Sequence, residues 1–217
     1  MIFSGLDLGA AKDFSALACA DRLPLPNPTP KRRWSYEVVH LETWELGSSY
    51  VTIAEKVQKR YEHPKLAGSV LVPDYTGVGR PVFDVLKSKR VRARMVPVLT
   101  TAGKLSHETD GIWHVPKIEL VSTLQVVLQG GFIKIDPRLT LASRLKKELT
   151  EFRVTITKSR NETFGADASQ HDDLVFALML AVWLGERDGG GTASGIGTPP
   201  VGEGNMTEAA GEGVFLT

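Results

Sequence analysis

The order of the apolar segments constrains this 217-residue chain more than any other feature. Three strand-like runs come first, at residues 2–9, 15–20 and 34–43, and consecutive strands favour an antiparallel meander. From residue 50 onward, segments with helical spacing alternate with short apolar runs, which favours strands connected through helices. We therefore predict an α/β fold in which a mixed sheet, three antiparallel strands followed by parallel strands, is flanked by helices.

The later elements follow from the same patterns. One helix begins at Pro116 and ends at the pair Gly130-Gly131, in line with the preference for proline at helix starts and glycine after helix ends. The proline-rich segment 24–30 is predicted to be a loop, because proline lacks the donor that a strand ladder requires. The other predicted helices cover residues 50–61, 78–89, 139–152 and 171–184, and the other predicted strands cover 69–72 and 91–99.

Composition limits the class of protein. Hydrophobic residues make up 42% and charged residues 24%, as in soluble globular proteins. The single cysteine, Cys19, excludes a disulfide framework or a thiolate zinc site within one chain. No signal peptide or membrane-spanning run is visible, so we expect an intracellular protein. Residues 1–187 are predicted to form one domain, and residues 188–217, with nine glycines, a flexible tail.

One aspartate lies inside a predicted strand, and a second follows the end of another. Asp7 lies in the apolar sequence Gly-Leu-Asp-Leu-Gly at 5–9, where an ionised carboxylate is costly unless it is paired or binds a cation. Asp74 follows a buried strand and precedes a glycine-rich turn, and α/β folds place ligands at the carboxyl ends of strands. Asp7 could instead stand at a strand end and begin a turn, and Asp74 could instead cap a helix or form an Asx turn.

A third acidic site lies at the start of the last predicted helix. Asp172 and Asp173 are adjacent there, and they would repel each other without a counter-cation. Ser169 and Asp172 alternatively resemble a capping box. Carboxylates are hard oxygen ligands that suit Mg²⁺ or Mn²⁺, and a pair of such ions can catalyse phosphoryl displacement. The three acidic sites meet that need if their segments converge on one sheet.

Four motifs together resemble a known family. They are Gly-Leu-Asp-Leu-Gly at 5–9, Asp-Tyr-Thr-Gly-Val-Gly at 74–79, Val-Pro-Lys at 115–117 and His-Asp-Asp-Leu at 171–174. In order and spacing, the chain resembles the nuclease domain of the large terminase subunit of tailed bacteriophages, which has an RNase H-like fold. The resemblance spans residues 5–177.

The resemblance implies a metal-dependent endonuclease that cuts concatemeric viral double-stranded DNA during genome packaging. It implies that Asp7, Asp74, Asp172 and Asp173 are catalytic and bind two divalent metal ions, Mg²⁺ or Mn²⁺, so that no side-chain base is needed. Implied partners are the packaging ATPase motor, the small terminase subunit and the portal, in the cytoplasm of the infected bacterial host. Basic side chains that could contact DNA phosphates are Arg80, Lys104, Lys117, Lys158 and Arg160.

Two other functions are compatible with parts of the sequence. An actin-like or sugar-kinase-like ATPase opens with a similar Gly-x-Asp-x-Gly turn, but such folds need two lobes and a second glycine turn. A non-catalytic packaging module that only docks would leave the acids dispensable. The chain contains no Gly-x-x-x-x-Gly-Lys-Ser/Thr phosphate loop, so the ATPase motor would be a separate polypeptide or a separate domain, and we expect cleavage without ATP.

Overall fold

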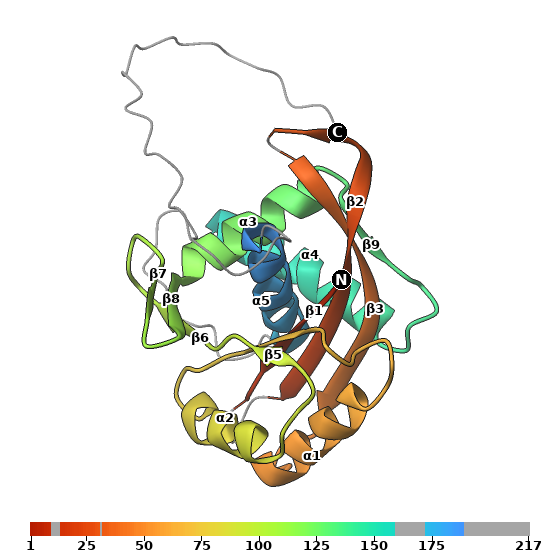
Figure 1. Ribbon diagram of the computed structural model, residues 1–217. Helices are drawn as coiled ribbons and strands as arrows, with labels where there is room; N and C mark the ends of the chain where they lie inside the picture. The colour runs from red at the N-terminus through yellow and green to blue at the C-terminus, as the bar shows by residue number, and fades with distance from the viewer. Residues whose placement is uncertain (10–13, 31, 159–171, 189–217) are drawn as a thin grey trace, which may run out of the picture.

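A six-stranded mixed sheet forms the centre of the protein (Figure 1). The computed structural model describes residues 1–9, 14–30, 32–158 and 172–188. The strand order is β5-β4-β1-β2-β3-β9, in which β1 to β3 pair antiparallel, and β4, β5 and β9 add parallel strands at the two sides. The strands are β1 Ile2–Asp7, β2 Ser15–Thr29, β3 Arg32–Trp44, β4 Val70–Pro73, β5 Arg94–Met95 and β9 Ile133–Ile135. The predicted mixed sheet is confirmed.

Helices cover both faces of this sheet (Figure 1). On one face, α1 Tyr50–Tyr61 and α2 Gly79–Ser88 pack against even-numbered residues of β1, such as Leu6. On the other face lie α3 Lys117–Gln129, α4 Ala142–Lys158 and α5 Asp173–Arg187. Because side chains alternate along a strand, Phe3, Gly5 and Asp7 all face this second side.

Helix α5 is the central helix of the second face. Almost all of its residues are buried, and it contacts β1, β2, β3 and β4. A Cβ atom added to Gly5 would lie 1.8 Å from the carbonyl oxygen of Ala177, so only glycine lets the helix lie this close to β1. The first glycine of the Gly-x-Asp motif therefore sets the distance between Asp7 and the helix that carries Asp173.

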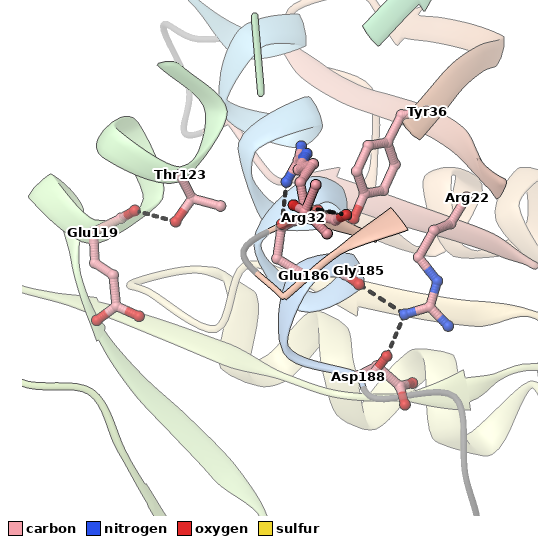
Figure 2. A network of polar contacts seen from close by, with 9 residues as sticks. Arg22, Arg32, Tyr36, Glu119, Thr123, Gly185, Glu186 and Asp188 are labelled. Carbon is pink, nitrogen blue, oxygen red and sulfur yellow. Dashed lines mark hydrogen bonds and ion pairs between the residues drawn. The ribbon is translucent and has the colours of Figure 1, made fainter. Parts of the chain in front are cut away.

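The C-terminal end of α5 is held by side chains from β2 and β3 (Figure 2). The Arg22 guanidinium donates to the carbonyl oxygens of Gly185 (2.7 Å) and Asp188, which are acceptors that a helix end leaves unsatisfied. Arg32 pairs with Glu186, and the Tyr36 hydroxyl donates to the same carboxylate at 2.7 Å. The end of the helix is thus fixed to the sheet by charge-assisted hydrogen bonds.

Two predictions about strands are wrong. The segment 24–30 is mostly strand, since β2 continues through its prolines to Thr29, although it pairs with β3 only at Pro24 and Thr29, with an irregularity between them. This is possible because β1 pairs with β2 only as far as Asp21, so that the proline-rich part of β2 has β3 as its one neighbour. The single strand predicted over 91–99 is divided at Pro97 into β5, in the central sheet, and β6 Val98–Thr101, in a second sheet.

The second sheet has the order β6-β8-β7, with β7 at His107–Thr109 and β8 at Ile112–Pro116. Sequence analysis missed β7, β8 and β9. The helix predicted over 50–61 is found with the same ends as α1, and the other predicted helices are found with shifted ends. Helix α4 continues beyond residue 152 through the β-branched segment 154–157. Among the described residues, no helix is long and apolar enough to cross a membrane. The predicted tail 188–217 lies outside the described residues except for Asp188, the C-cap of α5.

Candidate active site

Asp7 is the last residue of β1 and lies on the face that α5 covers. Its backbone pairs with Ala16 of β2. Burial raises the pKa of the Asp7 carboxyl well above its usual range, and the negative charges of Asp74, Asp173 and Asp172 raise it further. A carboxylate in this position is unfavourable in its charged form unless a cation compensates it.

Asp74 follows β4, the parallel neighbour of β1, so the two aspartates stand at the same edge of the sheet. The Asp74 amide donates to the carbonyl of Leu6 at 2.8 Å, which ties the two strand ends together. The side chain is mostly buried, and burial raises its pKa, while its Oδ1 accepts from the amide of Thr76 at 3.0 Å and opposes the rise. The turn that the sequence suggested as an alternative is therefore also present at Asp74.

The turn after Asp74 requires a glycine at its end. A Cβ atom on Gly79 would lie 2.0 Å from the carbonyl oxygen of Asp74, and the Gly79 amide donates to the carbonyl of Thr76 at 2.9 Å. Helix α2 therefore starts in direct contact with the backbone of Asp74. The Asp-x-x-Gly-x-Gly spacing holds this carboxylate at the strand end.

Asp172 and Asp173 begin helix α5. Asp172 is the N-cap residue, but its side chain makes no capping hydrogen bond. The Asp173 side chain is buried and its Oδ2 accepts from the Arg144 guanidinium of α4 at 3.3 Å. Ser169 and His171 lie outside the described residues.

The four predicted carboxylates thus gather where the carboxyl ends of β1 and β4 meet the amino end of α5. We call this group, Asp7, Asp74, Asp172 and Asp173, the acidic edge. Each of the other three raises the pKa of Asp7, which places their charges within electrostatic reach of it. The fold therefore joins residues from three distant segments, as the sequence analysis required.

The acidic edge fits divalent metals in donor type and in charge. All four side chains offer hard oxygen donors, and their clustered negative charge calls for a cation. In the part of the chain that the structure describes, no three His, Cys, Asp or Glu side chains form a closed ligand set. Asp173 pairs with Arg144, and Oδ1 of Asp74 accepts a hydrogen bond from the Thr76 amide. Coordination of a metal ion would therefore require these side chains to reorient.

Sequence reasoning missed two residues beside the acidic edge, Arg144 and Glu148. Arg144 donates to Glu148 at 2.8 Å, and the Glu148 side chain is only 4% exposed. Burial raises the pKa of the Glu148 carboxyl, while Arg144 opposes the rise. The sequence did contain a signal, because Glu148 interrupts the apolar stripe of Leu141, Leu145 and Phe152 in an otherwise amphipathic helix.

The predicted phosphate-contacting residues have different positions. Lys117, Arg80 and Lys104 are exposed. The Lys117 ammonium lies 5.9 Å from the ring centroid of Phe176, one turn into α5 from Asp172, and the Arg80 guanidinium lies 5.6 Å from that of Tyr75, next to Asp74. Lys117 and Arg80 are therefore near the acidic edge. The side chain of Lys158 and all of Arg160 lie outside the described residues.

Solved structures share this architecture. The zinc-bound large terminase nuclease from the thermophilic phage G20c superposes with a TM-score of 0.50 and 20% identity, over 83% of this chain and 79% of that one. This chain has the fold of a large terminase nuclease domain. The manganese-soaked terminase nuclease domain of human cytomegalovirus also has a TM-score of 0.50, with 13% identity over 83% of this chain and 82% of that one.

Sequence comparison gives the same relationship. The chain is 25% identical over 182 residues to the large terminase subunit of Thermus phage G20c, and the match covers 83% of the chain. It covers only 28% of that relative, so the chain spans little more than a quarter of the relative's length. No protein-family model matches the chain. The resemblance inferred from the motifs is confirmed, together with a fold shared with large terminase nuclease domains.

Proposed function

We propose that the chain is a metal-dependent endonuclease that cuts concatemeric viral double-stranded DNA during genome packaging. The observation that carries this proposal is the acidic edge, where four carboxylates converge from the ends of β1 and β4 and the start of α5, and where burial and the other three acids raise the pKa of Asp7. An actin-like or sugar-kinase-like ATPase is not favoured, because the relatives in fold are terminase nucleases.

Asp7, Asp74, Asp172 and Asp173 would hold two divalent ions, Mg²⁺ or Mn²⁺. When bound, such ions activate water and neutralise charge on the scissile phosphate and the leaving oxygen. Asp7 and Asp74 are fixed by the strand ends and by the bond from the Asp74 amide to Leu6. The protein thereby supplies a rigid pair of acids from the sheet and a second pair from the helix start.

Substrate binding is assigned to basic side chains beside the acidic edge. Lys117 and Arg80 are exposed and stand next to aromatic rings of the two segments that carry the acids. We include Lys104, Lys158 and Arg160 as further phosphate contacts, which bind DNA irrespective of its sequence. The proposed partners are the packaging motor, the small terminase subunit and the portal, in the cytoplasm of the infected host.

The test is cleavage of supercoiled plasmid without ATP, in buffers that contain Mn²⁺, Mg²⁺, Ca²⁺ or EDTA. We expect nicking or linearisation in Mn²⁺ or Mg²⁺ and none in EDTA. Asp7→Asn and Asp173→Asn should abolish cleavage, because each removes a charged metal ligand while keeping the side-chain volume. Asp136→Asn is the matched control, since Asp136 pairs with the exposed Arg138.

The outcomes separate the alternatives. An intact plasmid in every metal together with ATP hydrolysis by the wild type would favour the ATPase. Cleavage that persists in both acidic-edge variants would reject these carboxylates as the catalytic site. A wild type that neither cuts DNA nor hydrolyses ATP would favour the docking module.

A further inference from the structure

The first turn of α5 lacks the cap that its own sequence provides. An aspartate at the N-cap position normally accepts hydrogen bonds from the amides of the second or third helical residue. Asp172 occupies that position, yet its side chain makes no such bond. Its backbone carbonyl does accept the first bond within the helix, from Phe176 at 2.8 Å. The Asp172 side chain therefore does not cap the helix that it begins.

Glu148 of α4 makes the missing bonds from outside the helix. Its Oε2 accepts from the amide of Leu174 at 3.0 Å and from that of Val175 at 3.3 Å. Leu174 and Val175 are the second and third residues of α5, which are the donors that an N-cap side chain serves. One buried carboxylate thus replaces the local cap.

Arg144 completes the arrangement. It donates to the other oxygen of Glu148, Oε1, at 2.8 Å, and to Asp173 at 3.3 Å, and its guanidinium lies 5.1 Å from the ring centroid of Phe14. The buried charge of Glu148 is therefore balanced by a cation and by two amides. The same cation links Glu148 to the acidic edge.

We propose that Glu148 is a positioning residue: it caps α5 from the neighbouring helix, so that the carboxylate of Asp172 stays available to the metal site. Only the claim that Asp172 serves the metal site rests on the proposed function, because capping by Glu148 can be measured without metal. Without Glu148, Asp172 holds the N-cap position, from which an aspartate ordinarily accepts from the first-turn amides. It would then turn toward the helix and away from the metals.

The test is a double-mutant cycle of melting temperature in EDTA. In the wild-type background, Asp172→Ala should leave Tm unchanged or raise it, because it removes one of four clustered negative charges and no cap. In the Glu148→Ala background the same change should lower Tm, because Asp172 has become the cap. Glu148→Gln keeps the side-chain volume, but its single oxygen cannot accept from both Arg144 and the helix amides. In this background we therefore expect Asp172→Ala to lower Tm by less than it does in the Glu148→Ala background.

If Asp172→Ala changes Tm equally in all the backgrounds that fold, capping by Glu148 is overturned. If Glu148→Ala does not fold, the Glu148→Gln background decides alone. The second readout is Mn²⁺ binding, followed by electron paramagnetic resonance. Replacement of groups that orient metal ligands typically weakens metal binding by about 10- to 100-fold, and we expect a loss in that range for the Glu148 variants.

Lys147→Ala is the matched control on the same helix, because the Lys147 side chain is 75% exposed, and it should bind Mn²⁺ as the wild type does. Unchanged Mn²⁺ affinity in the Glu148 variants would overturn the positioning role, even where the Tm cycle shows coupling. A wild type that binds no Mn²⁺ would instead refute the proposed metal site, while the Tm cycle would still report on the cap.

Discussion

Replacement of Gly5 by alanine tests the packing that brings the sheet acids and the helix acids together. The added methyl group would lie 1.8 Å from the carbonyl oxygen of Ala177, whereas ordinary contact begins near 3.4 Å, so the separation must grow by about 1.6 Å. A backbone carbonyl inside a buried helix cannot rotate away. We therefore expect a cost at the upper end of the overpacking range, about 3 kcal/mol.

The assay is urea unfolding combined with thermal melting. A loss of about 3 kcal/mol lowers the Tm of a domain of this size by roughly 6–12 °C. Displacement of α5 by more than about 1 Å should also reduce cleavage on the order of 100-fold in the folded fraction. Gly103→Ala is the control, because its Cβ would meet only the Thr101 hydroxyl, at 3.3 Å. A Gly5→Ala protein with wild-type stability would refute the close approach of α5 to β1.

Three further predictions concern charge. Burial and the neighbouring carboxylates raise the pKa of Asp7, so the folded metal-free protein holds a proton that the unfolded chain releases near pH 4. The free energy of unfolding therefore falls as the pH rises from about 4 toward the raised pKa of Asp7. Asp7→Asn should remove this fall in stability and be more stable than the wild type at neutral pH, which urea unfolding in EDTA will measure. A stability equal to that of the wild type would contradict the repulsion between Asp7 and the neighbouring carboxylates. Lys117→Ala should weaken DNA binding and reduce the salt slope of log K by about 1, measured by fluorescence anisotropy, with Lys147→Ala as the unaffected control. Arg22→Ala should lower the free energy of unfolding in urea by about 3 kcal/mol, because it removes the charge-assisted hydrogen bonds to the end of α5 and the guanidinium that lies 4.3 Å from the Trp34 ring centroid. A loss below about 0.5 kcal/mol would show that other contacts anchor α5.

The sequence was informative where structure is set locally. Alternating or continuous apolar runs located β1, β3 and β4, and the end of the β4 run placed Asp74 at a strand end, because period-two alternation and turn residues act over a few neighbours. The run over 2–9 extends two residues beyond Asp7, where β1 ends. The same reasoning failed for β2, since the effect of proline depends on whether a partner strand lies on its N–H side. It also missed β7 and β9, which have three residues each and gain their order from neighbouring strands.

The four carboxylates of the acidic edge were predictable, but the residues beside it were not, for a related reason. The four aspartates stand beside recognisable turns and helix starts, whereas Glu148 meets α5 across 26 residues and Arg144 meets Asp173 across 29. Such contacts depend on how α4 packs against α5, which no local pattern encodes. An acid on the apolar stripe of α4 marks a buried charge that needs partners, but it does not identify them.

The position of Arg22 has a consequence for how the domain can be joined to other chains. The Met1 ammonium group donates to the Arg22 carbonyl at 3.2 Å, and the Arg22 guanidinium donates to the carbonyl of Asp188, so one residue touches both ends of the described domain. A circular permutant that links residue 188 to residue 1 and opens at the Gly47 turn should retain every strand pairing of the central sheet. Helix α5, with 15 residues, separates this corner from the acidic edge by about 22 Å, so a fusion partner attached at either end would begin a full helix length away from the candidate metal ligands.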